Sequence, residues 1–223
     1  MSFQLVTAID MRACNLIVFS LNQNFLAQLA HPMKEATAKD KDIVVDILTS
    51  SFQDNLSVNY LIPQGLKKQK RVRALMDYSF EACRLSGKVY LSEDRSGCAL
   101  VSFPEQKKTT LRSLWLEAKL VLRGIGPGNV TRAINREKEI SKNYPDVPIY
   151  YLWFIGVHPD SQNKGVGKSM MKELLADSQR MGRPVYLETS TLKNLPWYRK
   201  FGLEVYQKLN FGYDLFLIRN SVQ

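Results

Sequence analysis

The sequence predicts an α/β or α+β domain, in which helices cover both faces of a central sheet. Residues 149–157 are almost continuously apolar and aromatic, as expected of a strand that is buried on both faces. Val166 opens a stretch whose apolar residues recur at helical spacing, and Gly182 with Pro184 supplies the stop. Shorter strand-like and helix-like segments lie on both sides of this pair. Strands and helices in this mixed order indicate one sheet between two layers of helices.

The remaining elements follow from the spacing of apolar residues and from turn residues. Before the central strand we expect a strand at 34–37, a helix at about 40–52, a helix at about 65–85, a hairpin of strands 88–93 and 98–103, and helices at about 108–122 and 129–142. After the helix that follows Val166 we expect a strand at 185–188, a short helix at 194–201, and a hairpin of strands 203–209 and 211–218. The Gly-Pro-rich segment 124–128 follows no strand, so we interpret it as a helix–helix turn and not as a nucleotide loop.

The chain of 223 residues is long enough for one domain with a sizeable core. We interpret residues 1–32 as an N-terminal extension and residues 33–223 as the domain, with translation starting at either Met1 or Met33. Three cysteines without a Cys-x-x-Cys pair are typical of buried thiols in a reducing compartment. Two histidines are too few for a His-rich metal site. Because no apolar run reaches about 18 residues, we expect a cytoplasmic protein without a membrane span.

A net charge of +10 suggests an anionic partner. Basic residues are densest at 67–73, where apolar residues recur at helical spacing from Val72 to Cys83. We therefore interpret the cluster as the solvated face of an amphipathic helix. The alternative is a nucleic-acid site, but no aromatic platform lies beside the cluster, and we expect no nucleic-acid binding.

The most informative motif is the turn between the central strand and the next helix, Gln162-Asn163-Lys164-Gly165-Val166-Gly167-Lys168. The first N–H groups of a helix have no partner within it, and the helix dipole adds partial positive charge there. The glycines let the backbone approach a ligand closely, and the lysines add full charge. The turn therefore predicts a phosphate site.

Two well-known phosphate motifs do not fit this turn. Gly167-Lys168-Ser169 resembles the end of a Walker A loop, but that loop needs a glycine where this chain has Gln162. No clear strand ends in an aspartate that could hold Mg²⁺ for a nucleoside triphosphate. The dinucleotide pattern Gly-x-Gly-x-x-Gly also fails, because Met170 stands at its last position.

A third motif fits at every position. The pattern Val157-x-Pro159-x-x-Gln162-x-x-Gly165-x-Gly167 resembles the acetyl-CoA motif of the GNAT superfamily of N-acetyltransferases. About 30 residues further on, Asn194-x-x-x-Tyr198-x-x-x-Gly202-Leu203 is similar to the superfamily's C-terminal motif, with Leu203 where phenylalanine is usual. The resemblance covers about 147–205, and within the superfamily it looks closest to the branch that contains puromycin N-acetyltransferase.

The resemblance implies a mixed, mostly antiparallel sheet, splayed at the acetyl-CoA site (often at a bulge) and flanked by helices on both faces. It also implies a set of coenzyme contacts and no metal. The backbone of Ile155, Gly156 and Val157 would pair with the pantetheine arm. The amides of Asn163, Lys164, Gly165, Val166, Gly167 and Lys168 would hold the pyrophosphate. Gln162 would pin the turn or contact the coenzyme, and Asn194 would hold the coenzyme or cap its helix. Charge for the phosphates would come from Lys164, Lys168 and Arg199.

The chemistry that the resemblance implies is direct attack of an amine on the thioester. An N–H near residues 155–157 would stabilise the oxyanion, and Tyr198 would protonate the leaving thiolate. An alkyl amine with a pKa near ~10 is mostly protonated at neutral pH, so a base or water relay is needed. Glu188 is the best-placed carboxylate, with a structural hydrogen-bond acceptor as the alternative. The superfamily often carries a base on the strand at 149–157, where this chain has Tyr150 and Tyr151.

The sequence thus predicts an acetyl-CoA-dependent N-acetyltransferase that acts on a primary amine of a small molecule or peptide, as a monomer or homodimer. The alternative is a catalytically idle module that binds acyl-CoA as a sensor or scaffold. The acceptor would lie against the helices around 50–85 and 108–142. Aromatic candidates for its cleft are Tyr60, Trp115, Tyr150, Tyr151 and Trp153, with core packing as the more common alternative for such residues.

Overall fold

The computed structural model of this chain describes residues 33–220. The expected N-terminal extension, residues 1–32, lies outside this range, and Cys14 lies outside it as well. The described chain forms a seven-stranded sheet with the order β1-β2-β3-β4-β5-β7-β6. Neighbouring strands are antiparallel except for β4 and β5, which are parallel. The mixed, mostly antiparallel sheet expected from the sequence is confirmed.

The elements follow the predicted order. The strands are β1 (Met33–Glu35), β2 (Gly87–Ser92), β3 (Gly97–Ser102), β4 (Tyr150–Val157), β5 (Val185–Thr189), β6 (Leu203–Asn210) and β7 (Asp214–Asn220). The α-helices are α2 (Lys41–Phe52), α3 (Leu56–Leu61), α4 (Lys68–Ser86), α5 (Leu111–Leu120), α6 (Val130–Ser141), α7 (Val166–Arg180) and α8 (Leu195–Arg199). A π-helical turn, Val121–Ile125, continues α5 toward α6.

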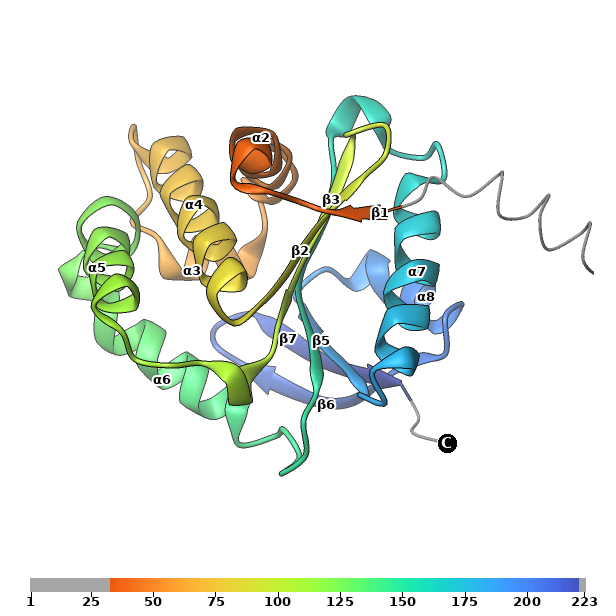
Figure 1. Cartoon of the computed structure of the whole chain (residues 1–223). Coiled ribbons are helices and arrows are strands. Elements are labelled where there is room, and N and C mark those ends of the chain that lie inside the picture. Colours follow the sequence, from red (N-terminus) through yellow and green to blue (C-terminus); the bar gives the residue numbers. More distant parts are fainter. Residues whose placement is uncertain (1–32, 221–223) are drawn as a thin grey trace, which may run out of the picture. The chain divides into compact units, whose positions relative to one another are not determined.

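Helices cover both faces of the sheet, as predicted (Figure 1). On one face α2 and α4 pack against β3 and β4, with Leu48 and Phe80 among the fully buried side chains. On the other face α7 lies against the same strands, and its buried stripe includes Met170, Met171 and Leu174. Each face of the sheet therefore has its own apolar core, which explains why residues on both faces of β4 are apolar.

The helix α3 is absent from the sequence-based prediction. Its N-cap residue Asn55 accepts a hydrogen bond from the backbone N–H of Val58, which starts the helix locally. Its length of six residues is less than two helical turns, too short for a periodic apolar pattern to appear. The helix matters because it carries Ser57 to the candidate site described below.

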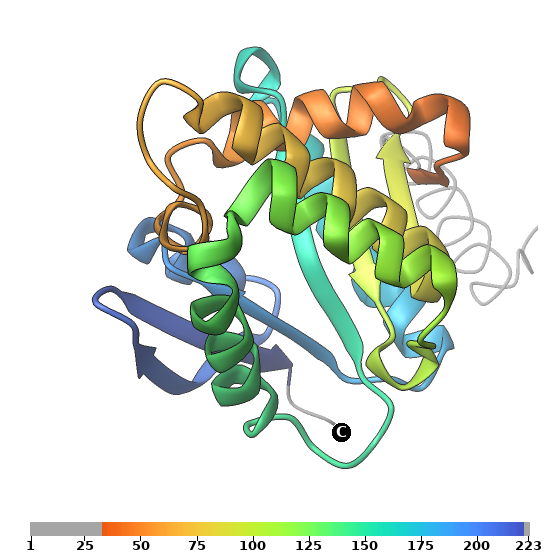
Figure 2. The same ribbon diagram turned by 90° about the vertical axis from the view of Figure 1, so that its left-hand side faces the viewer.

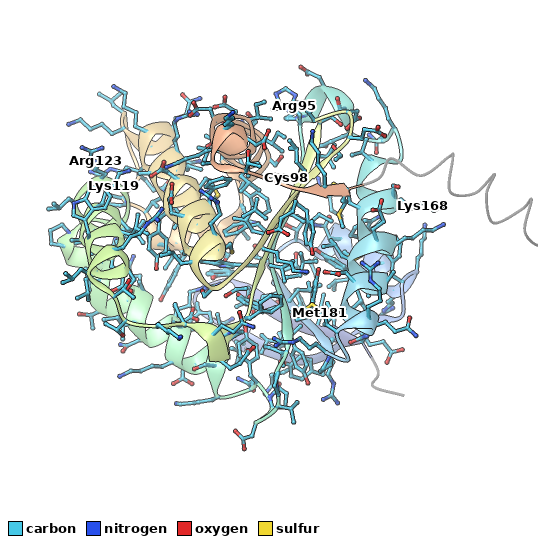
Figure 3. All side chains as sticks on the ribbon, in the orientation of Figure 1. Arg95, Cys98, Lys119, Arg123, Lys168 and Met181 are labelled. Atoms are coloured by element: carbon cyan, nitrogen blue, oxygen red, sulfur yellow. The ribbon has the colours of Figure 1, made fainter. Side chains whose placement is uncertain are left out.

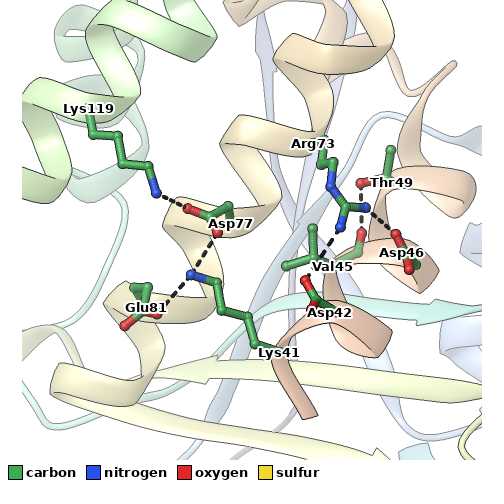
Figure 4. A network of polar contacts seen from close by, with 9 residues as sticks. All are labelled: Lys41, Asp42, Val45, Asp46, Thr49, Arg73, Asp77, Glu81 and Lys119. Carbon is green, nitrogen blue, oxygen red and sulfur yellow. Dashed lines mark hydrogen bonds and ion pairs between the residues drawn. The ribbon is translucent and has the colours of Figure 1, made fainter. Parts of the chain in front are cut away.

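The basic cluster at 67–73 lies at the start of α4 and forms its outer face, as predicted. Val72 is buried beneath it, whereas Arg73 is exposed and pairs with Asp42 and Asp46 on α2 (Figure 4). This arrangement explains part of the positive charge as internal pairing between helices. It leaves the glycine turn, at the far end of β4, as the region to test for an anionic ligand.

Three features bear on what the domain can do. Cys83 and Cys98 are buried free thiols, and burial raises the pKa of each, so neither is an activated nucleophile. Within residues 33–220, no group of three or more His, Cys, Asp and Glu side chains is placed to hold a metal ion. Nor does any helix in this part of the chain have the length and apolar character to cross a bilayer.

Candidate active site

The two edges of β4 are paired very unequally. One edge pairs with β3 along the strand. On the other edge, the parallel pairing with β5 is limited to Tyr150 with Val185 and Tyr151 with Tyr186. The two strands start side by side and then diverge (Figure 2). From residue 152 to residue 157, β4 therefore presents backbone groups that no strand of the described chain pairs with, and an extended ligand can bind such an edge.

A β-bulge lies where the splay begins. Leu100 of β3 pairs with Phe154, whereas the next residue Val101 pairs with Leu152, so Trp153 is the extra residue. Strict alternation would send Trp153 and Phe154 to opposite faces of the sheet. Because of the bulge, both pack against the core beneath α2 and α4. The bulge thus interrupts the regular pairing of β4 with β3. It also adds a second aromatic side chain to the face of β4 that α2 and α4 cover.

The glycine turn is tied to the end of β4. The carbonyl oxygen of Val157 accepts hydrogen bonds from Ser51 Oγ at 2.9 Å and from Gln162 Nε2 at 3.2 Å. Pinning the turn was one of the two roles expected of Gln162. Asn163 and Gly165 have positive φ angles of 63° and 88°, in the region that asparagine and glycine adopt most readily. These residue types are therefore required by the backbone path of the turn.

The helix α7 begins directly after Gly165, which offers no side chain to cap it. The amides of its first turn consequently have no acceptor within the helix. This turn lies close to the end of β4, since a Cβ on Gly167 would be 3.5 Å from Val157 Cγ2. Lys168 is exposed on this turn (Figure 3). Lys164 Nζ lies 2.8 Å from the carbonyl oxygen of Asp160, which keeps a second cation at the turn. The helix start is thus electropositive and open to an anion.

The second motif lies in α8 and the turn before it. Asn194 is the N-cap residue of α8, but its side chain makes no capping hydrogen bond. Tyr198 is only 6% exposed and packs edge to face on Trp197. Within residues 33–220 its hydroxyl has no hydrogen-bond partner. Burial, together with the nearby charge of Glu188, raises the pKa of the Tyr198 phenol, so the group carries its proton at neutral pH.

Glu188 lies on β5 and faces the splay. Its carboxylate accepts hydrogen bonds from the hydroxyls of Tyr144 and Tyr151, the latter at 2.7 Å. Loss of water around the carboxyl raises the pKa of Glu188 above its ordinary value, although both hydroxyls and the guanidinium of Arg136 act in the opposite direction. Glu188 and Tyr198, from different elements, therefore lie within each other's electrostatic influence.

Arg136 on α6 is a site residue that the sequence did not reveal. Its Nη2 donates to Ser57 Oγ at 2.6 Å, its Nε donates to the Tyr213 hydroxyl at 3.2 Å, and its guanidinium lies 6.0 Å from the Phe211 ring. These contacts fix a positive charge near Glu188. No local motif marks Arg136, because α6 reaches the site only through its packing against segments far away in the sequence.

A cavity of about 270 Å³ lies in the splay, on the side of the sheet that carries α2 and α4. Side chains from three strands (β4, β5 and β7) and five α-helices (α2 to α6) line it. The polar ones include Ser57, Arg136, Glu137 and Glu188. The aromatic ones are Phe52, Tyr78, Tyr151, Trp153 and Phe154. The cavity thus brings Glu188 together with two of the aromatic residues expected at the acceptor cleft, Tyr151 and Trp153.

The other three aromatic candidates do not line this cavity. Tyr150 faces α7, where its hydroxyl donates to Asp177 at 3.1 Å, because neighbouring residues of a strand face opposite sides. Trp115 is 62% exposed on α5. Tyr60 packs against the rings of Phe211 and Tyr213.

Comparison with known proteins adds independent evidence. The sequence profile of the acetyltransferase (GNAT) domain matches residues 117–205. An uncharacterized N-acetyltransferase of Schizosaccharomyces pombe is 28% identical over 185 residues, which make up 78% of this chain and 74% of the yeast protein.

Solved structures share the architecture. A structure described as histone acetyltransferase HPA2 and related acetyltransferase, from Corynebacterium glutamicum, superposes with a TM-score of 0.68 at 18% identity, covering 87% of this chain and 97% of that chain. Arylalkylamine N-acetyltransferase 2 from Aedes aegypti superposes with a TM-score of 0.57 at 14% identity, covering 86% and 99%. At these identities the likeness concerns the fold alone. In a matched segment, in the yeast relative and in its fold, the chain is therefore similar to acetyltransferases of the GNAT superfamily.

Proposed function

We propose that this protein is an acetyl-CoA-dependent N-acetyltransferase that transfers the acetyl group directly to a primary amine of a small molecule or peptide. The observation that carries the proposal is the unpaired edge of β4, which runs from the bulge at Trp153 to the glycine turn. An extended pantetheine arm can pair with such an edge like an added strand. The open helix start at the end of that edge suits a pyrophosphate.

In this arrangement the backbone of residues 155–157 pairs with the pantetheine arm. The amides of residues 163–168 hold the pyrophosphate, with Gln162 keeping the turn in place. Lys164 and Lys168 supply charge. Asn194 contacts the coenzyme from α8, and its lack of a capping hydrogen bond supports this role, because its amide group is left for a ligand.

The proposed reaction is attack of the amine nitrogen on the thioester carbonyl carbon. A backbone N–H of residues 155–157 stabilises the oxyanion that forms. The carbon–sulfur bond then breaks, and its electron pair leaves with sulfur. Tyr198 gives its proton to the thiolate, and the second proton of the attacking amine returns to the phenolate through solvent. The products are an acetamide and the free thiol of coenzyme A.

Before attack, the ammonium form of the acceptor must lose a proton. Glu188 takes this proton, directly or through a water molecule. Its raised pKa supports the role, because a base acts best when its pKa lies near the working pH. Tyr144 and Tyr151 orient the carboxylate through their hydrogen bonds, and Arg136 limits how far its pKa rises.

A catalytically idle module that binds acyl-CoA is the second candidate, since the β4 edge and the turn alone would serve it. Two measurements on the full-length chain separate the candidates. Calorimetric titration with acetyl-CoA tests binding, and release of free thiol over a panel of amines tests transfer. Binding with amine-dependent thiol release is the expected result. Tight binding without release on any amine would favour the sensor, and no binding would exclude both.

A further inference from the structure

We propose that the acceptor is a small primary amine carried on a flat aromatic body, bound in the cavity between β4 and β5. This inference rests on the proposed function, because it assigns the second substrate of the same site. It follows from the size of the cavity, the rings that line it, the polar groups that a ligand can reach there, and the position of charge.

The cavity is small for a ligand site. The cavity of about 270 Å³ is close to the lower limit of ligand sites, which span roughly 300–1,000 Å³. Residues of α2, α3, α4, α5 and α6 line it opposite the sheet and leave it partly open to solvent, and α4, α5 and α6 lie in front of the diverging strands in Figure 2. Such a space holds one ring with a short side chain. A peptide acceptor would need an open groove for its main chain.

Aromatic rings form one wall of the cavity. Phe52 and Phe154 meet edge to face with ring centroids 5.0 Å apart, and Tyr78 and Trp153 do the same at 6.3 Å. These contacts hold the rings in fixed orientations, against which a further aromatic ring can pack. Such packing contributes interaction free energy beyond that of buried area alone. Trp153 belongs to this wall only because the bulge turns it to the same face as Phe154. The bulge in the β3–β4 pairing, which lies beside the free edge of β4, therefore also shapes the proposed acceptor site.

Two polar groups at the cavity are free to bond a ligand. Tyr78 and Trp153 line the cavity, and within residues 33–220 no hydrogen bond is made by the Tyr78 hydroxyl or the Trp153 Nε1–H. Neither atom is among the fully buried unsatisfied polar atoms of this range, so solvent or a ligand can reach both. Burial raises the pKa of Tyr78 to about 12, so its hydroxyl remains a donor at neutral pH. A polar substituent on the aromatic body of the acceptor would satisfy these groups.

The charged side chains of the cavity are unevenly placed. Glu188 and Glu137 line the cavity together with Arg136 and Lys107, so its total charge is balanced. Arg136 is already engaged with Ser57 and Tyr213. Lys107 and Glu137 are exposed at the rim, which leaves the carboxylate of Glu188 as the charge beside the bulge. An ammonium group is attracted to that carboxylate and to the faces of the surrounding rings.

The test compares matched amines on the full-length chain with acetyl-CoA as donor. We expect kcat/KM for 2-phenylethylamine to exceed that for 2-cyclohexylethylamine, which has similar size without a flat ring, and to exceed that for aminoethanol and a lysine-containing tetrapeptide by at least roughly tenfold. Transfer that favours aminoethanol or the peptide would overturn this inference and leave the proposed function standing.

Variants locate the preference in the cavity. Trp153→Leu and Tyr78→Leu should each lower kcat/KM for 2-phenylethylamine roughly tenfold and change that for aminoethanol by less than about twofold. Unchanged affinity for acetyl-CoA shows that each variant is folded. Trp115→Leu, at an exposed tryptophan outside the cavity, is the matched control. Equal losses for both amines would contradict an aromatic site.

A further arm keeps the inference testable if no amine is acetylated, which would refute the proposed function. Binding of N-acetyl-2-phenylethylamine to the parent chain and to Trp153→Leu is then measured by calorimetric titration. Binding that is lost in Trp153→Leu would support an aromatic ligand in this cavity. Absence of binding to the parent chain would overturn the inference.

Discussion

The protein holds acidic side chains in two contrasting settings, one between α2, α4 and α5 and one in the splay between β4 and β5. In the first, Asp77 lies 2.7 Å from Lys41 Nζ and 2.8 Å from Lys119 Nζ (Figure 4). Glu81, one turn along α4, contacts Lys41 at 2.9 Å and Arg112 at 2.8 Å. Partial burial acts to raise the pKa of both carboxyls, but the bonded cations outweigh it and hold both below their ordinary values.

Glu188 differs in the nature of its partners. Its two hydrogen bonds come from neutral tyrosine hydroxyls, and the nearest cation, Arg136, is bonded to other groups. Loss of water therefore dominates, and the pKa of Glu188 rises. The comparison teaches that burial and the charge of the partners act together. Cations outweigh a partial loss of water at Asp77 and Glu81, whereas at Glu188 a fuller loss of water outweighs mostly neutral partners.

The largest expected effect is the loss of the Glu188 carboxylate. Glu188→Gln keeps the size of the side chain but cannot take a proton, so kcat/KM for the amine should fall by about 10²–10⁴. Affinity for acetyl-CoA should stay within about twofold, because Glu188 is not among the proposed coenzyme contacts. Thiol release and calorimetric titration measure the two quantities. Asp77→Asn, the same change in the ion-paired setting, is the matched control, and a Glu188→Gln enzyme with the parent rate would exclude Glu188 as base.

The pH dependence sharpens the same comparison. Glu188 must be ionised to accept a proton, so kcat/KM should fall as the pH drops through its pKa. Because that pKa is raised, the acid limb of the profile should lie above the value of about 4.3 for an ordinary glutamate. Asp77→Asn should leave the limb in place. If the acid limb of the kcat/KM profile persists in Glu188→Gln, the titrating group is a residue other than Glu188.

The next effect concerns the proton donor. Tyr198→Phe removes the hydroxyl and keeps the ring that packs on Trp197, so the fold and the KM for acetyl-CoA should be retained. We expect kcat to fall by about 10²-fold, at the lower end of general acid catalysis, because a thiolate is a good leaving group. Single-turnover acetyl transfer measures the step. Full activity would refute the role of Tyr198 as acid.

Much of the fold could be predicted because its signals are local. The apolar run of β4 and the helical spacing that starts at Val166 depend on neighbouring residues, and both elements occur where predicted. The glycine turn is local too, since Asn163 and Gly165 are residue types that its positive φ angles require. The proposed coenzyme side of the site consists almost entirely of such contiguous segments.

The acceptor side could not be predicted in the same way. Tyr144, Arg136 and Tyr78 come from segments with no motif, and they meet Glu188 or Trp153 only through packing of α4, α6 and β5. The bulge at Trp153 also has no sequence signal, yet it decides which way that ring faces. The strand period alone would have placed Trp153 and Phe154 on opposite faces.

A smaller effect is expected on stability from the ion-paired setting. Asp77→Asn should lower the free energy of unfolding at neutral pH by about 1–2 kcal/mol, because Lys119 can regain water and Lys41 keeps Glu81 as a partner. The pKa of Asp77 is lowered in the folded state, so its contribution is present above the unfolded value of about 3.9 and is lost as the pH falls through the folded value. Urea unfolding at two pH values should therefore show a difference from the parent that shrinks in acid. An equal difference at both would assign the effect to packing.

The smallest effect tests whether the open start of α7 differs from the rest of that helix. Lys168 and Lys172 are both exposed lysines on α7, one turn apart, but only Lys168 lies in the first turn beside the unsatisfied amides. Lys168→Ala should raise the KM for acetyl-CoA about three- to fivefold at low ionic strength, and less in 0.5 M salt, because exposed charges are screened. Lys172→Ala should change it by less than about twofold. Equal effects of the two substitutions would mean that the coenzyme responds to the overall charge of the helix, and the phosphate site would then not lie at the glycine turn.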